Sequence, residues 1–183
     1  KKEQDVNNID WLDKVKYIQG DINEKNDNWY KYLTKPDILI HLAWQDLPNY
    51  SELFHIERNL FSDYIFLKNL INNGLKDLSI AGTCFEYGSI FGELKEDLMP
   101  KPNNPYAIAK NILRIFLEEH QKISNFHLKW IRLFYPYGDG QSTRSILSLL
   151  DQAIERGETT FNMSGGEQLR DYSPVEDMAK YII

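Results

Sequence analysis

Tyr106 and Lys110 are the two residues of this chain whose types and spacing are best suited to proton transfer. They stand four positions apart, so a helix would place both side chains on one face. A free tyrosine has a pKa of about 10, too high for a base at neutral pH, but a nearby ammonium favours the phenolate. Such a pair can take a proton from a hydroxyl group or return one to a ketone. The hydroxyl of Thr83 could orient the reacting oxygen.

A tyrosine and a lysine at this spacing also occur by chance, because the chain holds 11 tyrosines and many lysines. The alternative interpretation is a Tyr–Lys pair on a solvated helix face. The two interpretations differ in whether the surrounding elements bring other functional groups to the same place.

Short apolar runs alternate with helical patterns along most of the sequence. The predicted strands cover residues 15–18, 37–42, 78–81 and 127–134. The predicted helices cover residues 24–33, 51–73, 105–122 and 145–156, and a last one opens at Pro174. This alternation predicts an α/β fold with a doubly wound parallel sheet covered by helices on both faces.

Ligands of such sheets bind at the carboxyl ends of the strands. The segments that follow Leu42, Ala81 and Phe134 should therefore line one crevice. Residues 82–104 hold Gly, Pro and Asn and are predicted to form a long loop, and loops of that length are usually functional. Thr83 lies at the start of this loop, and Tyr106 follows its end.

The composition is that of an ordinary globular protein, with 42% apolar and 26% charged residues. Lys and Arg number 21 and Asp and Glu number 27, and the net charge of −6 makes nucleic acid and anionic membranes poor candidates as partners. The single cysteine, Cys84, excludes an internal disulfide and predicts a reducing, cytoplasmic location. The first eight residues are polar and carry no signal-peptide core. The four histidines show no metal-ligand spacing, so no metal site is predicted.

Five segments resemble, in the right order, the extended short-chain dehydrogenases/reductases, a Rossmann-fold family of NAD-dependent epimerases and dehydratases that act on nucleotide sugars. The segments are GDI at 20–22, HLAW at 41–44, TCFEYG at 83–88, PYAIAK at 105–110 and LRDYSPVED at 169–177. Each motif is weak alone, and their common order makes the resemblance specific.

The resemblance implies a role for each matching residue. Thr83 would hydrogen-bond the reacting oxygen, Tyr106 would be the acid/base, and Lys110 would bind the nicotinamide ribose and depress the pKa of Tyr106. Arg170 would join Thr83 and Tyr106 in binding the substrate, at its nucleotide diphosphate. Further cofactor contacts are expected at Asp21, Ile22, Leu42, Ala43, Trp44, Asn59 and Phe134. For Asn59 a solvated helix position is the alternative.

The resemblance also implies a cofactor, a substrate class and an assembly. We expect NAD or NADP, a nucleotide-diphosphate sugar, and a homodimer formed through the helices at 51–73 and 105–122. An epimerase, acting at C4, and a 4-keto-sugar reductase are both consistent with the sequence. Residues 1–142 would form a partial dinucleotide-binding domain, and residues 143–183 the start of the substrate-binding portion.

Three departures from the family pattern shape these expectations. The glycine-rich phosphate loop is absent, so we expect a fragment that lacks the family's N-terminal unit, also stops early, and binds cofactor poorly. Tyr135 stands where the family usually has asparagine. Cys84 and Phe85 replace the acidic residues of 4,6-dehydratases, so a dehydratase with Cys84 as its acid is a less favoured interpretation than an epimerase or a reductase.

Two alternative interpretations assign no chemical role. Cys84 would be a packed loop residue without a chemical role, because free cysteine is commonly buried. The whole chain would be a non-catalytic dinucleotide-binding scaffold, because one fold serves many functions.

Overall fold

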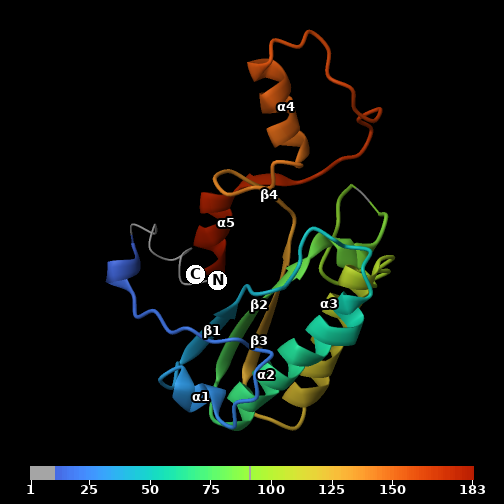
Figure 1. Ribbon diagram of the computed structural model, residues 1–183. Coiled ribbons are helices and arrows are strands. Elements are labelled where there is room, and N and C mark those ends of the chain that lie inside the picture. The colour runs from blue at the N-terminus through green and yellow to red at the C-terminus, as the bar shows by residue number, and fades with distance from the viewer. Residues whose placement is uncertain (1–10, 91) are drawn as a thin grey trace.

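The main sheet consists of three parallel strands, as the sequence predicts. The computed structural model describes residues 11–90 and 92–183, so the first eight residues lie outside the described part. The strands are β1 (Ile38–His41), β2 (Asp77–Thr83) and β3 (His127–Leu133), in the order β1-β2-β3 (Figure 1). In this register Leu39 pairs with Leu78, which pairs with Leu128. The carboxyl ends of the strands therefore meet at one edge.

Two long helices, α2 (Leu60–Asn72) and α3 (Pro105–Gln121), connect these strands and lie on one face of the sheet (Figure 1). Crossovers between parallel strands are right-handed, and both crossovers here step in the same direction along the sheet, so both helices reach the same face. Ile38 and Ile40 of the edge strand β1 stay exposed.

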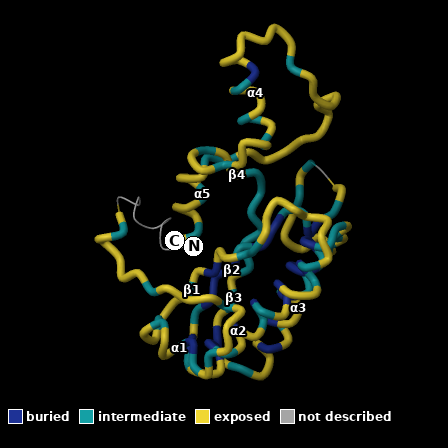
Figure 2. The backbone as a smooth tube through the Cα atoms, viewed as in Figure 1, coloured by how far each residue is buried: buried dark blue, intermediate teal, exposed yellow. Residues whose placement is uncertain are grey.

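The core lies between these two helices and the sheet. Ala109, Leu113 and Leu117 recur every four residues along α3 and are fully buried, because this spacing keeps them on one side of the helix. They pack with Leu78 and Ile80 of β2 and with apolar residues of α2 in a single cluster. Figure 2 shows the buried residues concentrated in this part of the molecule.

The rest of the chain forms a smaller unit beyond the carboxyl end of the sheet. Its strands are β4 (Tyr135–Tyr137) and β5 (Tyr172–Pro174), and its helices are α4 (Ile146–Glu155) and α5 (Val175–Ile182). Tyr135 pairs with Tyr172 in a parallel two-stranded ladder. None of the helices among residues 11–90 and 92–183 is long and apolar enough to cross a membrane.

In the first part of the chain, several of the predicted helices and strands differ from those of the structure. Residues 15–18 form no strand, because no neighbouring strand shares a hydrogen-bond ladder with them. The helix predicted at 24–33 is only the single turn α1 (Trp29–Tyr32), because Asn28 caps its start and Thr34 and Lys35 leave it with positive φ. The helix predicted from residue 51 begins as a π-helix at His55–Asn59 and continues as α2.

Candidate active site

Thr83 and Tyr106 meet at the carboxyl end of β2. Thr83 ends the strand and caps a 3-10 helix (Cys84–Tyr87), with its hydroxyl accepting the N–H of Phe85. Tyr106 lies in the first turn of α3, where Asn104 caps the helix by accepting the N–H of Ala107. Thr83 and Tyr106 are 6% and 7% exposed, and hydrogen bonding to the Thr83 hydroxyl favours the ionised form of the Tyr106 phenol. The structure therefore brings together the first two residues of the predicted site.

Lys110 lies one helical turn beyond Tyr106 and is only 1% exposed. Its ammonium donates a hydrogen bond to the carbonyl of Ala81 at 2.8 Å and lies 4.1 Å from the centroid of the Trp44 ring. Burial lowers the pKa of Lys110 to about 8, because desolvation disfavours the charged form. The negative charges of Asp63 and Glu86 oppose this shift.

Aromatic rings enclose the phenol of Tyr106. The centroids of Tyr50 and His55 lie 5.4 Å from that of Tyr106, and those of Trp44 and Phe85 lie 5.8 and 6.4 Å away. Burial among these rings raises the pKa of Tyr106 to about 12. This departs from the expectation that Lys110 depresses the pKa of Tyr106. The ammonium of Lys110 faces Trp44 and the Ala81 carbonyl instead.

Glu86 fixes the segment that carries Thr83. Its carboxylate is fully buried and accepts hydrogen bonds from the Thr83 backbone N–H, from Trp130 Nε1 and from Arg132 Nε. The last two residues belong to β3, so the Thr83 segment is tied to the neighbouring strand. A Cβ at Gly82 would lie 2.3 Å from Trp130 Nε1 and 2.7 Å from Glu86 Oε1, which explains why glycine precedes Thr83.

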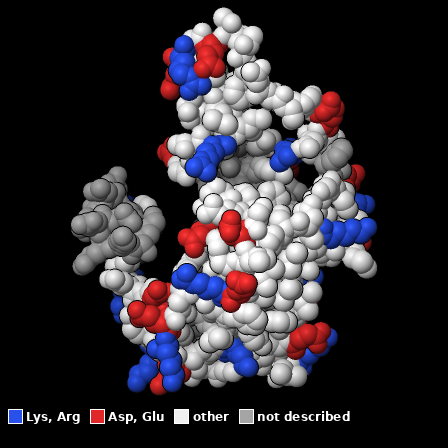
Figure 3. Space-filling view, turned by 45° about the vertical axis from the view of Figure 1, so that its right-hand side comes forward, with Lys and Arg blue, Asp and Glu red and all other residues white. Residues whose placement is uncertain are grey.

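A pocket of about 620 Å³ opens between the 3-10 helix that follows Thr83 and the smaller unit. Its lining includes Cys84, Phe134, Tyr135 and Arg170. The Arg170 guanidinium lies 4.6 Å from the centroid of the Tyr135 ring, so a cation is present at the wall of the pocket. On the face shown in Figure 3, basic and acidic side chains are otherwise interspersed, without a large field of one sign.

Cys84 is a half-buried residue of this pocket wall. Burial raises the pKa of its thiol, and a hydrogen bond with Tyr135 and the charge of Arg170 partly oppose the shift. The side chain is therefore a neutral thiol at physiological pH.

Asn59 is buried, which shows that the alternative of a solvated helix position is wrong. Its side-chain amide donates to the carbonyl of Gln45 at 3.1 Å and lies 3.3 Å from His55 Nδ1. These bonds fix the segment that follows β1. Leu42 and Ala43 of that segment are exposed at the strand end, so their surfaces are open to a ligand.

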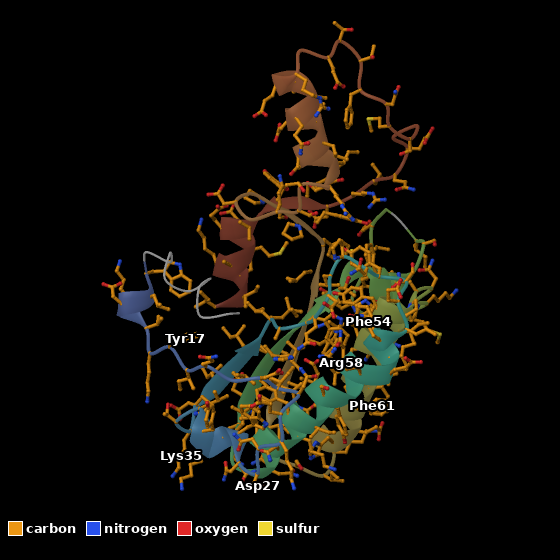
Figure 4. All side chains as sticks on the ribbon, in the orientation of Figure 1. Tyr17, Asp27, Lys35, Phe54, Arg58 and Phe61 are labelled. Carbon is orange, nitrogen blue, oxygen red and sulfur yellow. The ribbon has the colours of Figure 1, made fainter. Side chains whose placement is uncertain are left out.

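Asp21 and Ile22 lie on the segment before α1, away from the catalytic side chains. Asp21 accepts the N–H of Asn23 within a turn, and this hydrogen bond lowers the pKa of the Asp21 carboxyl. Ile22 packs against the core. In Figure 4, Tyr17 and Asp27, which bracket this turn in sequence, lie far from Phe54, the neighbour of His55.

The donor groups present fit the ribose of a nicotinamide cofactor. An ammonium has three N–H donors. Within the described part of the chain, the Lys110 ammonium donates one of them, to the Ala81 carbonyl. The other two have no hydrogen-bond acceptor among the described residues, and a diol would reach them once the covering side chains, Trp44 among them, moved aside. Exposed apolar residues at the end of β1 provide a surface for the rest of such a ligand.

Comparison with known proteins identifies the family. A sequence model of the NAD dependent epimerase/dehydratase family matches residues 1–183. The chain belongs to this family. A dTDP-6-deoxy-L-talose 4-dehydrogenase (NAD(+)) of Aggregatibacter actinomycetemcomitans is 32% identical over 147 residues, which cover 80% of this chain and 54% of that protein. A dTDP-4-dehydro-6-deoxyglucose reductase of Escherichia coli is 23% identical, over 91% of this chain and 63% of its own length. This epimerase-family chain thus spans about half to two thirds of the length of these relatives.

Solved structures of the family share the fold. A UDP-N-acetylglucosamine 4-epimerase from Methanobrevibacter ruminantium, in complex with UDP-N-acetylmuramic acid, has a TM-score of 0.73 and 25% identity, over 83% of this chain and 52% of its own. A UDP-glucuronic acid 4-epimerase from Bacillus cereus, in complex with NAD, has a TM-score of 0.73 over 87% of this chain and 52% of its own, and at 23% identity it supports the fold alone.

Sequence reasoning missed the contacts that hold the site together. Trp44 was expected to contact the cofactor, whereas its ring also covers the Lys110 ammonium. His55 and Glu86 were not identified as parts of the site. No local pattern in the sequence marks these contacts.

Proposed function

We propose that the whole protein is an NAD(P)-dependent enzyme that moves a hydride between the nicotinamide and a carbon of a nucleotide-diphosphate sugar. The observation that carries this proposal is the convergence of Thr83, Tyr106 and Lys110 at the carboxyl end of β2. Cys84 and Asn104, which neighbour this cluster in sequence, line a pocket with Arg170 in its wall. The 32% identity to a dTDP-6-deoxy-L-talose 4-dehydrogenase (NAD(+)) supports chemistry at C4 of the sugar. A C4 epimerase and a 4-keto-sugar reductase are both versions of this proposal.

In this proposal each side chain has a distinct task. Bound NAD(P) would accept or supply the hydride. In the direction of ketone reduction, Tyr106 donates its proton to the oxygen of the reacting carbon, and its raised pKa keeps the phenol protonated for this step. Thr83 hydrogen-bonds the same oxygen and orients it. In the direction of oxidation Tyr106 takes the proton, and the hydrogen bond with the Thr83 hydroxyl favours the phenolate that this requires.

The smaller unit, in this proposal, begins the substrate-binding portion from residue 143. Arg170 would pair with the diphosphate, because a guanidinium recognises phosphate oxygens bidentately. The half-buried Cys84 and Phe85 provide no carboxylate for the elimination of water, which disfavours a 4,6-dehydratase.

The proposed acid/base role is tested by Tyr106→Phe in the whole protein. General acid/base groups contribute about 10²–10⁴-fold to rate, so turnover of the sugar should fall by that factor while NAD(P) still binds. Tyr172→Phe is the matched control, because Tyr172 is 41% exposed and lies outside the catalytic cluster. Activity near normal in Tyr106→Phe would refute the assignment.

The nucleotide content of the purified whole protein tests whether the reaction is an epimerisation or a ketone reduction. It is measured by mass spectrometry after denaturation. Tightly held NAD at near one equivalent would identify a self-recycling epimerase, and UDP- and dTDP-sugars would then be screened for interconversion. Little bound nucleotide, with binding of added NADPH, would identify a reductase. A protein that binds neither nucleotide would contradict the proposed function and favour a non-catalytic scaffold.

A homodimer and a cytoplasmic location are further parts of the proposal. Phe61 and Ile65 of α2 and Ile115 and Phe116 of α3 are large apolar residues with exposed fractions of 36–65%, and apolar patches of this kind are typical of interfaces. Light scattering should give twice the chain mass for the whole protein and the single mass for Ile65→Asp. A monomeric unaltered protein would contradict the dimer.

A further inference from the structure

Trp44 stands against the buried ammonium of Lys110. Its ring centroid lies 4.1 Å from Lys110 Nζ, and the side chain of Lys110 is almost completely excluded from water. The described residues provide the ammonium with one hydrogen-bond acceptor, the carbonyl of Ala81. A cation over an indole face is attracted by the ring quadrupole, and the attraction is stronger where water is excluded. The indole therefore takes the place of part of the hydration shell.

A hydrogen bond fixes the orientation of this indole. Trp44 Nε1 donates to His55 Nδ1 at 3.0 Å, and the planes of the two rings lie within 22° of each other. His55 Nε2 lies 3.0 Å from the carbonyl of Asn49. A carbonyl only accepts, so Nε2 carries the proton and Nδ1 is free to accept from Trp44. Neutral His55 is thus the form that holds the ring.

The π-helix His55–Asn59 places the holding residues. Both of its end residues are buried, and Asn59 also donates toward His55 Nδ1 and to the carbonyl of Gln45, the residue after Trp44. π-helical turns are rare and occur frequently at functional sites. Here the turn directs His55 and Asn59 to the same segment at the end of β1.

We propose that Trp44 is a positioning residue for Lys110: its indole face holds the ammonium at the Ala81 carbonyl, one helical turn beyond Tyr106, and His55 holds the indole. The catalytic consequence of this contact rests on the proposed function, whereas the contact between Trp44 and Lys110 does not. The ammonium is then already in place, with unused N–H donors, before a ribose binds. Loss of the ring face should loosen the ammonium without emptying the core.

The contact itself is tested by NMR of the whole protein with labelled lysine, without cofactor. Methylene protons above an indole ring resonate upfield of their usual position, so the ε-methylene protons of Lys110 should be shifted in this direction. The shift should persist in part in Trp44→Phe and disappear in Trp44→Leu. Both variants lose the N–H donated to His55, and only the second loses the ring face. Trp11→Leu is the control, because Trp11 is exposed and distant in sequence.

The functional consequence is tested by the dissociation constant of NAD(P) and by turnover in the same proteins. A buried cation–π contact predicts that Trp44→Leu weakens cofactor binding roughly tenfold, while Trp44→Phe stays within about threefold of the unaltered protein on the same scale. Equal effects of the two variants would overturn the inference, because side-chain volume and the lost N–H would then explain the result.

Two outcomes separate the inference from the proposed function. An unshifted Lys110 methylene in the unaltered protein would overturn the positioning role even if no Trp44 variant folds. A shifted methylene that follows Trp44 as expected, in a protein that neither binds NAD(P) nor converts any nucleotide sugar, would support the contact and refute the proposed function.

Discussion

The part of the molecule built on the three-stranded sheet and the smaller unit beyond it differ in how they are stabilised. α2 and α3 of the sheet part bury apolar and polar side chains alike. In the smaller unit, α4 buries Ala153 alone and α5 buries none of its residues, a contrast visible in Figure 2. The side chains for chemistry lie in the densely packed part, and Arg170 lies on the exposed one. Proton transfer requires fixed geometry, whereas binding of a large ligand tolerates adjustment.

The two parts also differ in where they place charge. The sheet part buries Glu86 against Arg132, His41 against Asp63, and the ammonium of Lys110. The ion pairs of the smaller unit, such as Lys180–Asp177, lie in solvent. Breaking a buried pair leaves an uncompensated charge, while an exposed pair contributes little to stability. This difference can be measured directly.

Glu86→Gln should produce the largest loss of stability. It removes the negative charge beside Arg132, and breaking a buried pair typically costs about 3–5 kcal/mol. Asp177→Asn, its counterpart in the smaller unit, should change the free energy of unfolding by less than about 0.5 kcal/mol. Urea unfolding of both variants measures the contrast, and similar small losses would show that the two parts do not differ in this respect.

Leu113→Ala should cost almost as much as Glu86→Gln. Leu113 is fully buried in the core, and truncation of such a leucine costs about 2–5 kcal/mol, including the cavity that remains. Ile154→Ala in α4 should cost less than about 1 kcal/mol, because Ile154 is 64% exposed and loses little buried area. Comparable losses at the two positions would mean that α4 is buried in the whole protein.

Lys110→Met should stabilise the protein while abolishing turnover. The pKa of Lys110 is lowered from 10.5 to about 8, so burying the charged lysine costs the folded state about 3 kcal/mol. The hydrogen bond that methionine cannot make offsets about 1 kcal/mol of this. The gain of about 2 kcal/mol should be present below pH 8 and disappear as the pH rises past 10.5, above which the lysine is neutral in both states. Thermal unfolding across this range tests the sign, and a destabilised variant would contradict it.

Mild acid should have the smallest effect, confined to the sheet part. Burial lowers the pKa of His55 and of His120 from 6.5. Below pH 6.5 the unfolded chain therefore binds more protons than the folded one, and the free energy of unfolding falls as the pH drops. Residues 135–183 contain no histidine, so the hydrogen-exchange protection factors at pH 5.5, corrected for the intrinsic rate at that pH, should fall around α2 and α3 but not in α4. An equal fall in α4 would argue against this origin.

The sequence by itself determined the features that depend on neighbouring residues. Asn104 and Pro105 begin α3 because one caps the helix and the other has a fixed φ suited to its first turn. The four-residue spacing then places Tyr106 and Lys110 on one helix face. The order of the five motifs identified the family without knowledge of any contact. Strand and helix alternation predicted the parallel sheet for the same local reason.

Only the tertiary structure decided what surrounds these residues. A strand needs a partner for its hydrogen bonds, so the extended residues 15–18 did not become one. Trp44 and His55 reach Lys110 and Tyr106 because the segment after β1 and the π-helix pack against α3, a contact between segments far apart in the chain. Burial by these distant segments raised the pKa of Tyr106 against the sequence-based expectation, because desolvation depends on everything that packs around a group and not on its neighbours in sequence.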